Sequence, residues 1–235
     1  MFGSMKIVKA RPLALIDDTD RLIEYSTAMD RMQALWQERV EDRRPDTLWL
    51  LSHEPTFTIG RRTPEAHLPA PGTAIPVIET NRGGQLTYHG PGQLVGYLVV
   101  KLRQGEGVVD YIREVEYRMI ATLDTLGIAA ERRETPPGSE PLTGVWTSRT
   151  GRKITSIGMR VGRNVSTHGF AVNVAGDLGP WQMAIPCGMS DVDMTSVERE
   201  LANQPAPTLD KVAMAVATAF EARITSGPTL SLIHI

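Results

Sequence analysis

The sequence has little cysteine and no long apolar run. Cys187 is the one cysteine among 235 residues, so it cannot form an intrachain disulfide, and no cluster with metal-ligand spacing surrounds it. This usage is typical of a reducing compartment, and we expect a cytoplasmic protein. No apolar run approaches the roughly 18 to 20 residues of a membrane span, and the N-terminus lacks the apolar core of a signal peptide. The sequence therefore predicts no membrane association.

An excess of charge of one sign is also lacking. Lys and Arg number 25 against 27 Asp and Glu, which gives a net charge of -2. This balance excludes a general attraction to nucleic acid or to anionic membranes, so a charged partner must meet a local patch. The 41% hydrophobic content is typical of a folded globular chain. We expect one domain over residues 5–227, with residues 1–4 and about 228–235 as cloning additions or disordered ends.

Helical periodicity appears in three segments. Apolar residues recur over residues 19–41 after the cap candidates Asp18 and Thr19. A second stripe covers residues 112–126 and ends at Gly127, in the position of a left-handed C-cap. The last stripe runs from Leu209 to Ile224 with Thr208 as its N-cap. We expect a helix at each place.

Short strand-like runs lie between these helices. They cover residues 47–52, 75–79, 144–146, 153–161 and 166–174. The last three are separated by short polar turns, a spacing that is typical of an antiparallel meander. Long helices between clusters of short strands predict an α+β fold with a mixed, largely antiparallel sheet.

Residues 82–93 combine four glycines and a proline with an arginine, a tyrosine and a histidine. Glycines let the backbone approach a ligand closely, and Arg82 and His89 can supply charge or proton transfer at the same wall. A glycine-rich hairpin without a ligand explains the same composition. No Gly-Lys-Ser/Thr follows and no Gly-x-Gly-x-x-Gly is present, which disfavours nucleotide chemistry.

Cys187 and Lys153 are candidates for nucleophilic chemistry. Cys187 lies in a small-residue turn, where its thiol is either an exposed nucleophile or an inert buried group. A catalytic thiol needs a base or a cation beside it, and Lys153, His89 and His168 are the candidates. Lys153 begins an apolar strand, where burial favours the neutral amine that can accept a proton. A lysine whose ammonium reaches solvent is the structural alternative.

Four ordered segments together resemble the lipoyl(octanoyl) transferase family. They are residues 82–97, 153–158, 168–173 and 186–188. From the first to the last, these segments extend over about half of the chain. The resemblance implies an α+β fold shared with biotin and lipoate protein ligases. It also implies transfer of an octanoyl group from acyl carrier protein to a lysine of a lipoyl domain, the first step of endogenous protein lipoylation.

The resemblance assigns roles to residues of this chain. Cys187 is similar to the family nucleophile that becomes an acyl thioester, and Lys153 to the residue that activates it. Thr155 and Met159 depart from the family pattern and put the width of the pocket in question. The segments that line the acyl site in the family match Arg82, Gly83, Gly84, Gln85, Leu86, Thr87, Tyr88, His89, Ser156, Ile157, Gly158, Gly169, Phe170 and Ala171.

The resemblance also implies partners. The donor is octanoyl-acyl carrier protein, and the acceptors are lipoyl domains of 2-oxoacid dehydrogenase complexes and the glycine cleavage H protein. We expect a monomer without cofactor or metal, which docks acidic partners through clusters such as Arg61 with Arg62. Three alternatives stay open: an ATP-dependent lipoate ligase, a cysteine hydrolase that uses His89 or His168, and a binding module without activity.

Overall fold

The computed structural model describes residues 11–61, 63–139, 141–184, 192–202 and 204–224. Its helices are α1 (Tyr25–Val40), α2 (Val108–Thr125), α3 (Val197–Leu201) and α4 (Leu209–Ala219), with short 3-10 turns η1 (Glu65–His67) and η2 (Gly179–Gln182). Its strands are β1 (Leu13–Ile23), β2 (Thr47–His53), β3 (Thr56–Gly60), β4 (Val77–Thr80), β5 (Thr87–His89), β6 (Gln93–Val99), β7 (Ala130–Glu131), β8 (Gly144–Thr147), β9 (Lys153–Gly162), β10 (Val165–Asn173) and β11 (Ala222–Ile224).

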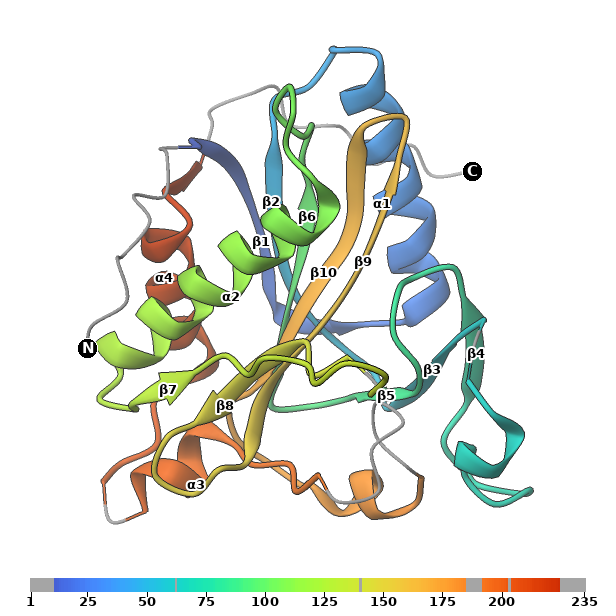
Figure 1. Cartoon of the computed structure of the whole chain (residues 1–235), viewed down its shortest axis with the longest axis vertical. Helices are drawn as coiled ribbons and strands as arrows, with labels where there is room; N and C mark the ends of the chain where they lie inside the picture. The colour runs from blue at the N-terminus through green and yellow to red at the C-terminus, as the bar shows by residue number, and fades with distance from the viewer. Residues whose placement is uncertain (1–10, 62, 140, 185–191, 203, 225–235) are drawn as a thin grey trace.

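Within the described residues the strands form two sheets (Figure 1). The large sheet has the order β11-β1-β2-β6-β10-β9-β8-β7, and the small one has the order β4-β3-β5. In the large sheet β1 pairs parallel with β11 and β2, while the pairs from β2 to β7 are antiparallel. The predicted α+β fold with a mixed, largely antiparallel sheet is confirmed.

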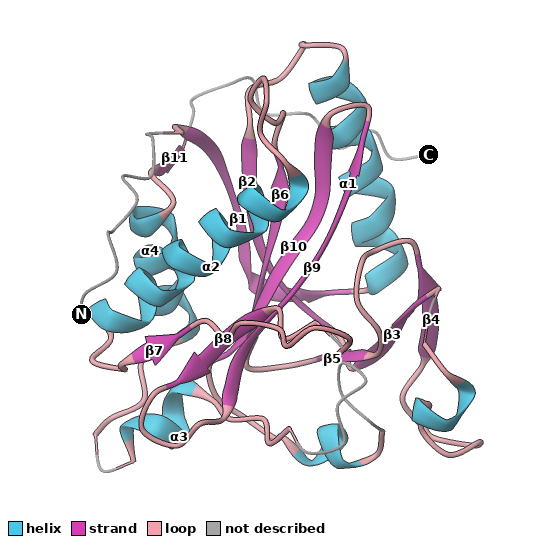
Figure 2. Cartoon of the chain, viewed as in Figure 1, coloured by secondary structure: helices cyan, strands magenta, loops and turns pink. Residues whose placement is uncertain are grey.

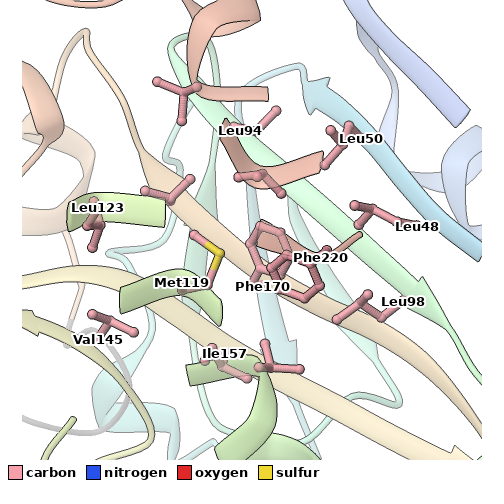
Figure 3. Packing of buried hydrophobic residues seen from close by; sticks show 14 of the residues in the cluster. Leu48, Leu50, Leu94, Leu98, Met119, Leu123, Val145, Ile157, Phe170 and Phe220 are labelled. Atoms are coloured by element: carbon pink, nitrogen blue, oxygen red, sulfur yellow. The ribbon is translucent and has the colours of Figure 1, made fainter. Parts of the chain in front are cut away.

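Helices cover the large sheet on both faces (Figure 2). Strand residues alternate between the faces, so on β2 Leu48 and Leu50 join the apolar cluster under α2 and α4, while Trp49 and Leu51 join the cluster under α1. At the centre of the first cluster the rings of Phe170 and Phe220 stack with centroids 5.3 Å apart (Figure 3). The sheet thus separates two distinct cores.

The predicted helix over residues 19–41 begins too early. Asp18 and Thr19 lie in β1, and α1 begins at Tyr25. The N-cap is Glu24, whose carboxylate accepts hydrogen bonds from the backbone N–H groups of Ser26 and Thr27. Glutamate is not among the usual N-cap residues, so the preferred cap types upstream gave the wrong position.

The two other predicted helices, α2 and α4, are present, and their predicted caps at Gly127 and Thr208 can be compared with the structure. Helix α2 begins at Val108, four residues before the predicted 112–126 segment, and ends at Thr125 with Leu126 as its C-cap. Gly127 follows with a φ of 79°, which confirms the predicted left-handed conformation at the end of the helix. Thr208 caps α4 by accepting the N–H of Lys211, as predicted. The C-terminal end of that prediction is wrong, because α4 ends at Ala219 and Ile224 lies in β11 beside β1.

The predicted strands are all present, and the meander of β8, β9 and β10 is confirmed as antiparallel. The turn between β9 and β10 has Arg163 and Asn164 at its centre, both with positive φ (49° and 63°), as in the two-residue type I′ hairpin loop. Among the described helices, none is long and apolar enough to cross a membrane.

Candidate active site

A cavity of about 310 Å³ lies between the glycine-rich segment and the large sheet. It is lined by Arg82, Gly83, Gly84, Gln85, Leu86, Thr87, His89, Val95, Tyr97, Ile112, Pro141, Thr143, Lys153, Ser156, Ile157, Gly158, Met159, His168, Gly169, Phe170 and Ala171. Segments far apart in the sequence therefore meet around one space. Its size is within the range of small-molecule sites.

The hollow follows from small residues that stand opposite one another in the sheet. Directly paired residues of antiparallel strands face the same side. Two such rows cross β6, β10 and β9, one with Val95, Ala171 and Ser156 and the other with Tyr97, Gly169 and Gly158. Four of these six residues are glycine, alanine or serine, whose side chains are absent or small. The side chains therefore fill little of the space above the sheet here, which leaves room for a ligand.

The wall opposite the sheet comes close enough for backbone to touch backbone. The N–H of Gly83 donates to the carbonyl of Met159 at 3.1 Å. A Cβ on Gly158 would lie 2.7 Å from the carbonyl oxygen of Gly83, and one on Gly83 would lie 2.8 Å from that of Met159. Glycine at both positions is thus required by the close approach.

Arg82 stabilises this wall through hydrogen bonds to Thr58 and Gly83. Its guanidinium donates to the Thr58 carbonyl at 2.6 Å and to the Thr58 hydroxyl, and Nη1 donates to the carbonyl of Gly83 at 3.0 Å. These bonds tie the segment to β3. The structure thus gives Arg82 a part in holding the wall, in addition to the positive charge that it brings to the cavity.

A chain of oriented hydrogen bonds ends at His89. The Gln93 amide nitrogen donates to the carbonyl of Tyr88 and to Oδ1 of Asn173, both at 3.0 Å, so its oxygen is left to accept from Nδ1 of His89 at 2.7 Å. Burial, followed by the nearby His53, lowers the pKa of His89 well below its ordinary value. His89 is therefore a neutral imidazole at physiological pH, with Nδ1 protonated.

His53 and Tyr97 form a second oriented pair. Nδ1 of His53 lies 2.8 Å from the carbonyl of Ile23 and must donate to it, so Nε2 accepts from the hydroxyl of Tyr97 at 2.7 Å. The ring of Tyr25 stacks on that of His89, with the ring centres 5.9 Å apart. Burial lowers the pKa of His53 to about 4 and raises that of Tyr25 to about 12, so neither group carries charge near pH 7.

His168 adopts a left-handed conformation within β10. Its φ is 59°, a value at which histidine is enriched among residues other than glycine. Nε2 lies 3.0 Å from Oδ1 of Asn81, and burial, with the charge of Arg82 second, lowers the pKa of His168 to about 3. The cavity is thus bordered by buried histidines that stay neutral.

Lys153 is the buried amine of the site, with 1% of its side chain exposed. Its Nζ lies 5.4 Å from the centre of the Trp146 ring, a cation–π distance. Its backbone is fixed on both sides, because its N–H donates to Asp193 and its carbonyl accepts from Thr195, both at 2.9 Å. Of the two alternatives for Lys153, the structure shows the buried side chain and not one whose ammonium reaches solvent.

Most of the predicted site residues meet at the cavity. The exceptions are Tyr88, whose ring packs against Phe57 and Trp181 and is absent from the lining, and Cys187, which lies outside the described residues. Of the two departures from the family pattern, Met159 lines the cavity and Thr155 does not. The width of the pocket therefore depends on Met159.

Sequence reasoning missed several lining residues. Val95, Tyr97, Ile112, Pro141 and Thr143 all border the cavity. Val95 and Tyr97 could have been found, because the glycine-rich segment runs directly into their strand and period-2 alternation places both on one face. Among the described residues, no three His, Cys, Asp or Glu side chains gather closely enough to hold a metal ion.

Comparisons with known proteins match the chain along most of its length. The chain matches the family model of the lipoyl protein ligase A/B catalytic domain over residues 24–221. It is 53% identical over 202 residues to an octanoyltransferase of Frankia casuarinae, which covers 85% of this chain and 91% of that protein. It is 40% identical over 211 residues to an octanoyltransferase of Mycolicibacterium gilvum, with 87% and 85% covered.

Solved structures share the fold at low identity. A lipoate-protein ligase A bound with ATP superposes with a TM-score of 0.64 at 16% identity, covering 94% of this chain and 89% of that chain. A chain from the structure of a bi-partite lipoate protein ligase and its E2 lipoyl domain from Thermoplasma acidophilum gives 0.61 at 15%, covering 93% and 86%.

Fold and family model together define the class as a catalytic domain of the lipoyl protein ligase A/B type. The curated relatives narrow this class further, because their sequences match along most of both chains. The chain belongs to the octanoyltransferase family, and it is a transferase that acts in octanoyl transfer for protein lipoylation. The predicted family resemblance is confirmed.

Proposed function

We propose that this transferase moves an octanoyl group from acyl carrier protein to a lysine of a lipoyl domain through a thioester on Cys187. The observation that carries the proposal is Lys153, a nearly fully buried amine on the border of a cavity with apolar and glycine walls. We assign contact with the acyl thioester to segments 82–89, 156–158 and 169–171. The catalytic unit that we propose is one cytoplasmic, monomeric domain over residues 5–227.

In the first step Lys153 accepts the proton of the Cys187 thiol. The thiolate attacks the carbonyl carbon of the octanoyl thioester, and the bond from that carbon to the sulfur of the carrier arm breaks. The proton on Nζ then leaves with the carrier thiol. One thioester replaces another, so the step needs no ATP.

In the second step the lysine of the lipoyl domain attacks the acyl-enzyme. A carbon–nitrogen bond forms, the bond to Sγ of Cys187 breaks, and Lys153 passes the proton that the amine loses to the departing thiolate. The product is an amide, and the enzyme returns to its starting form. The acceptors that we propose are lipoyl domains of 2-oxoacid dehydrogenase complexes and the glycine cleavage H protein.

The apolar lining supports a medium-chain acyl group. Leu86, Val95, Ile112, Ile157 and Phe170 border the cavity. Six methylenes transferred from water to such a surface contribute about 5 kcal/mol at roughly 0.8 kcal/mol each. This contribution favours an octanoyl chain over a short one.

The lowered pKa values of His89 and His168 favour Lys153 as the proton acceptor. A base with a low pKa holds a proton poorly, and burial lowers the pKa of both His89 and His168. His168 also has its Nε2 at Asn81. A cysteine hydrolase that relies on either imidazole is therefore less well supported than transfer with a lysine base.

The direct test is the mass of the enzyme after incubation with octanoyl carrier protein and no acceptor. We expect one octanoyl adduct on the peptide that contains Cys187, and none on the Cys187→Ser variant, because a hydroxyl is a far weaker nucleophile. Donor turnover without an adduct would contradict the thioester. Free octanoate as the product would identify a hydrolase, and dependence on ATP a ligase.

A second test separates a base from a positive field at Lys153. Lys153→Arg keeps the charge but cannot give up its proton, so we expect at least a hundredfold loss of kcat, in line with the roughly 10²- to 10⁴-fold contribution of general bases. Lys153→Ala serves as the reference for complete loss. An active arginine variant would limit Lys153 to an electrostatic role.

Docking of acidic partners depends on arginines that are not already paired. Arg132 pairs with Glu134 and Arg149 with Glu200, whereas Arg61 is exposed and Arg62 lies outside the described residues. We expect charge reversal at Arg61 and Arg62 to lower kcat/KM for the carrier protein in a salt-dependent way. A small uncharged octanoyl thioester serves as the control donor, for which kcat/KM should not change.

A further inference from the structure

A buried carboxylate lies beside the site and has no part in the steps above. Glu116 of α2 is fully buried, four residues after Ile112, which lines the cavity, so the two share a helix face. Its Oε1 accepts the backbone N–H of Gly144 at 3.0 Å, and its Oε2 accepts from Arg113 at 2.7 Å. Burying a carboxylate is costly unless it is paired and hydrogen-bonded, so both contacts matter.

Gly144 lies directly against Lys153. With a φ of 134°, Gly144 has a conformation that side chains rarely adopt. A Cβ placed there would lie 2.7 Å from Cε of Lys153 and 2.5 Å from the carbonyl oxygen of Thr155. The backbone of Gly144 thus forms one side of the slot that holds the lysine side chain.

The other sides of this slot are also rigid. The Trp146 ring faces Nζ, and the backbone of Lys153 is bonded to Asp193 and Thr195. A long lysine side chain has many rotamers in solution, and a rigid slot removes this freedom before the reaction begins. Glu116 is hydrogen-bonded to the side of the slot that lies at the start of β8, directly after a proline-rich loop.

We propose that Glu116 is a positioning residue for Lys153, which acts through its hydrogen bond to the backbone of Gly144. The inference rests on the proposed role of Lys153 as the proton acceptor. This positioning role differs from a purely electrostatic one, because kcat depends on the oxygen of Glu116 that accepts the hydrogen bond and not on its negative charge. It differs from a purely structural role, because kcat is affected apart from stability.

The experiment compares Glu116→Leu with Glu116→Gln in transfer from octanoyl carrier protein to a lipoyl domain. The leucine variant loses the bond to Gly144, and we expect kcat to fall by about 10- to 100-fold, since displacement of a reacting group by about 1 Å costs up to about 10²-fold. KM should stay within about twofold of wild type. The glutamine variant keeps an acceptor oxygen, so kcat should recover to within about threefold of wild type.

Glu114→Leu is the matched control on the same helix. Glu114 is 10% exposed and pairs with Arg118 at 3.0 Å, away from the lining of the cavity. We expect this variant to lower Tm but to leave kcat unchanged below the unfolding transition. An unchanged kcat in Glu116→Leu would overturn the proposal, and an equal loss in Glu116→Gln would assign the effect to charge.

A second pair of variants keeps the test valid if Glu116→Leu does not fold. Gly144→Ala should lose kcat by tenfold or more, because the new Cβ meets the Lys153 side chain. Gly138→Ala also strains a residue of positive φ, but nothing lies within 4 Å of its new Cβ, so it should change Tm alone. A folded Gly144→Ala with normal kcat would contradict the proposal. Activity of Lys153→Ala would instead contradict the proposed function on which it rests.

Discussion

The two faces of the large sheet are built from different chemistry. The face under α2 and α4 is an apolar cluster that includes Leu48, Leu98 and Phe220 (Figure 3). The face under α1 also has apolar residues, but it includes a fully buried polar group in which His53 contacts Tyr97. The first face gains stability from area removed from water, whereas the second needs each donor and acceptor to find its partner. Tyr97 connects this polar group to the cavity, because it also lines it.

The comparison predicts that the free energy of unfolding depends strongly on pH. The histidines that cause this dependence lie on the α1 side of the sheet and at the cavity beside it. Burial lowers the pKa of His53 from 6.5 to about 4 and that of His168 to about 3, and it lowers the pKa of His89 as well. The unfolded chain then binds more protons than the folded one below pH 6.5. Stability is therefore fully present above pH 6.5 and is lost as the pH falls toward 4.

His53 and His168 each add up to about 1 kcal/mol per pH unit within that window, and His89 adds to the slope in the same direction. Urea unfolding at pH 7.0, 6.0 and 5.0 measures it. His168→Asn keeps a side chain that tolerates positive φ and should make the slope clearly shallower. A free energy of unfolding that does not change between pH 7 and 5 would contradict the neutral buried state of these groups.

On the apolar face, a truncation should be costly and independent of pH. Leu98 is fully buried in the cluster under α2 and α4 and does not line the cavity. Leu98→Ala should lower the free energy of unfolding by about 2 to 5 kcal/mol through the cavity it leaves. The same loss is expected at pH 7 and pH 5. Val109→Ala, at a residue that is 66% exposed, is the control and should change stability by less than about 0.5 kcal/mol.

On the polar face, removal of a single hydroxyl oxygen should lower the free energy of unfolding even though the shape of the side chain is kept. Tyr97→Phe leaves Nε2 of His53 without its donor, at a cost of about 1 to 3 kcal/mol. Tyr117→Phe, at a residue that is 42% exposed, removes a hydroxyl that accepts a long, solvent-exposed hydrogen bond from Arg132 at 3.3 Å, and it should have little effect. Denaturation of both variants at pH 7 makes the comparison. Equal stabilities would mean that the polar group does not depend on its hydrogen bonds.

The fold could be predicted where local signals act alone. The turn at Arg163 and Asn164 determines the register of β9 with β10, and this register places Gly158 opposite Gly169. The small residues at the cavity could thus have been paired from the sequence. Strand β1 could not be predicted, because three aspartates and an arginine lie within it and its two parallel partners are distant in the chain.

The candidate site was predictable only where its residues lie in recognisable segments. Lys153 and the glycine-rich wall were found in this way, and the structure brings them to one cavity. Glu116 was not found, because a glutamate on an amphipathic helix is usually a solvated residue. Its burial follows from a contact with Gly144, which is 28 residues away, and no local pattern reports such a contact.

Where Gly83 and Gly158 meet, the wall of the cavity is made of main chain. A main-chain wall cannot be reshaped by point substitution, since any side chain added at either glycine would collide with backbone. Changes of substrate range, by evolution or by design, are thereby confined to positions that already present side chains, such as Leu86, Ile112 and Met159. The glycine contact divides the site into a part that is the same for every acyl chain and a part that can adapt to its length.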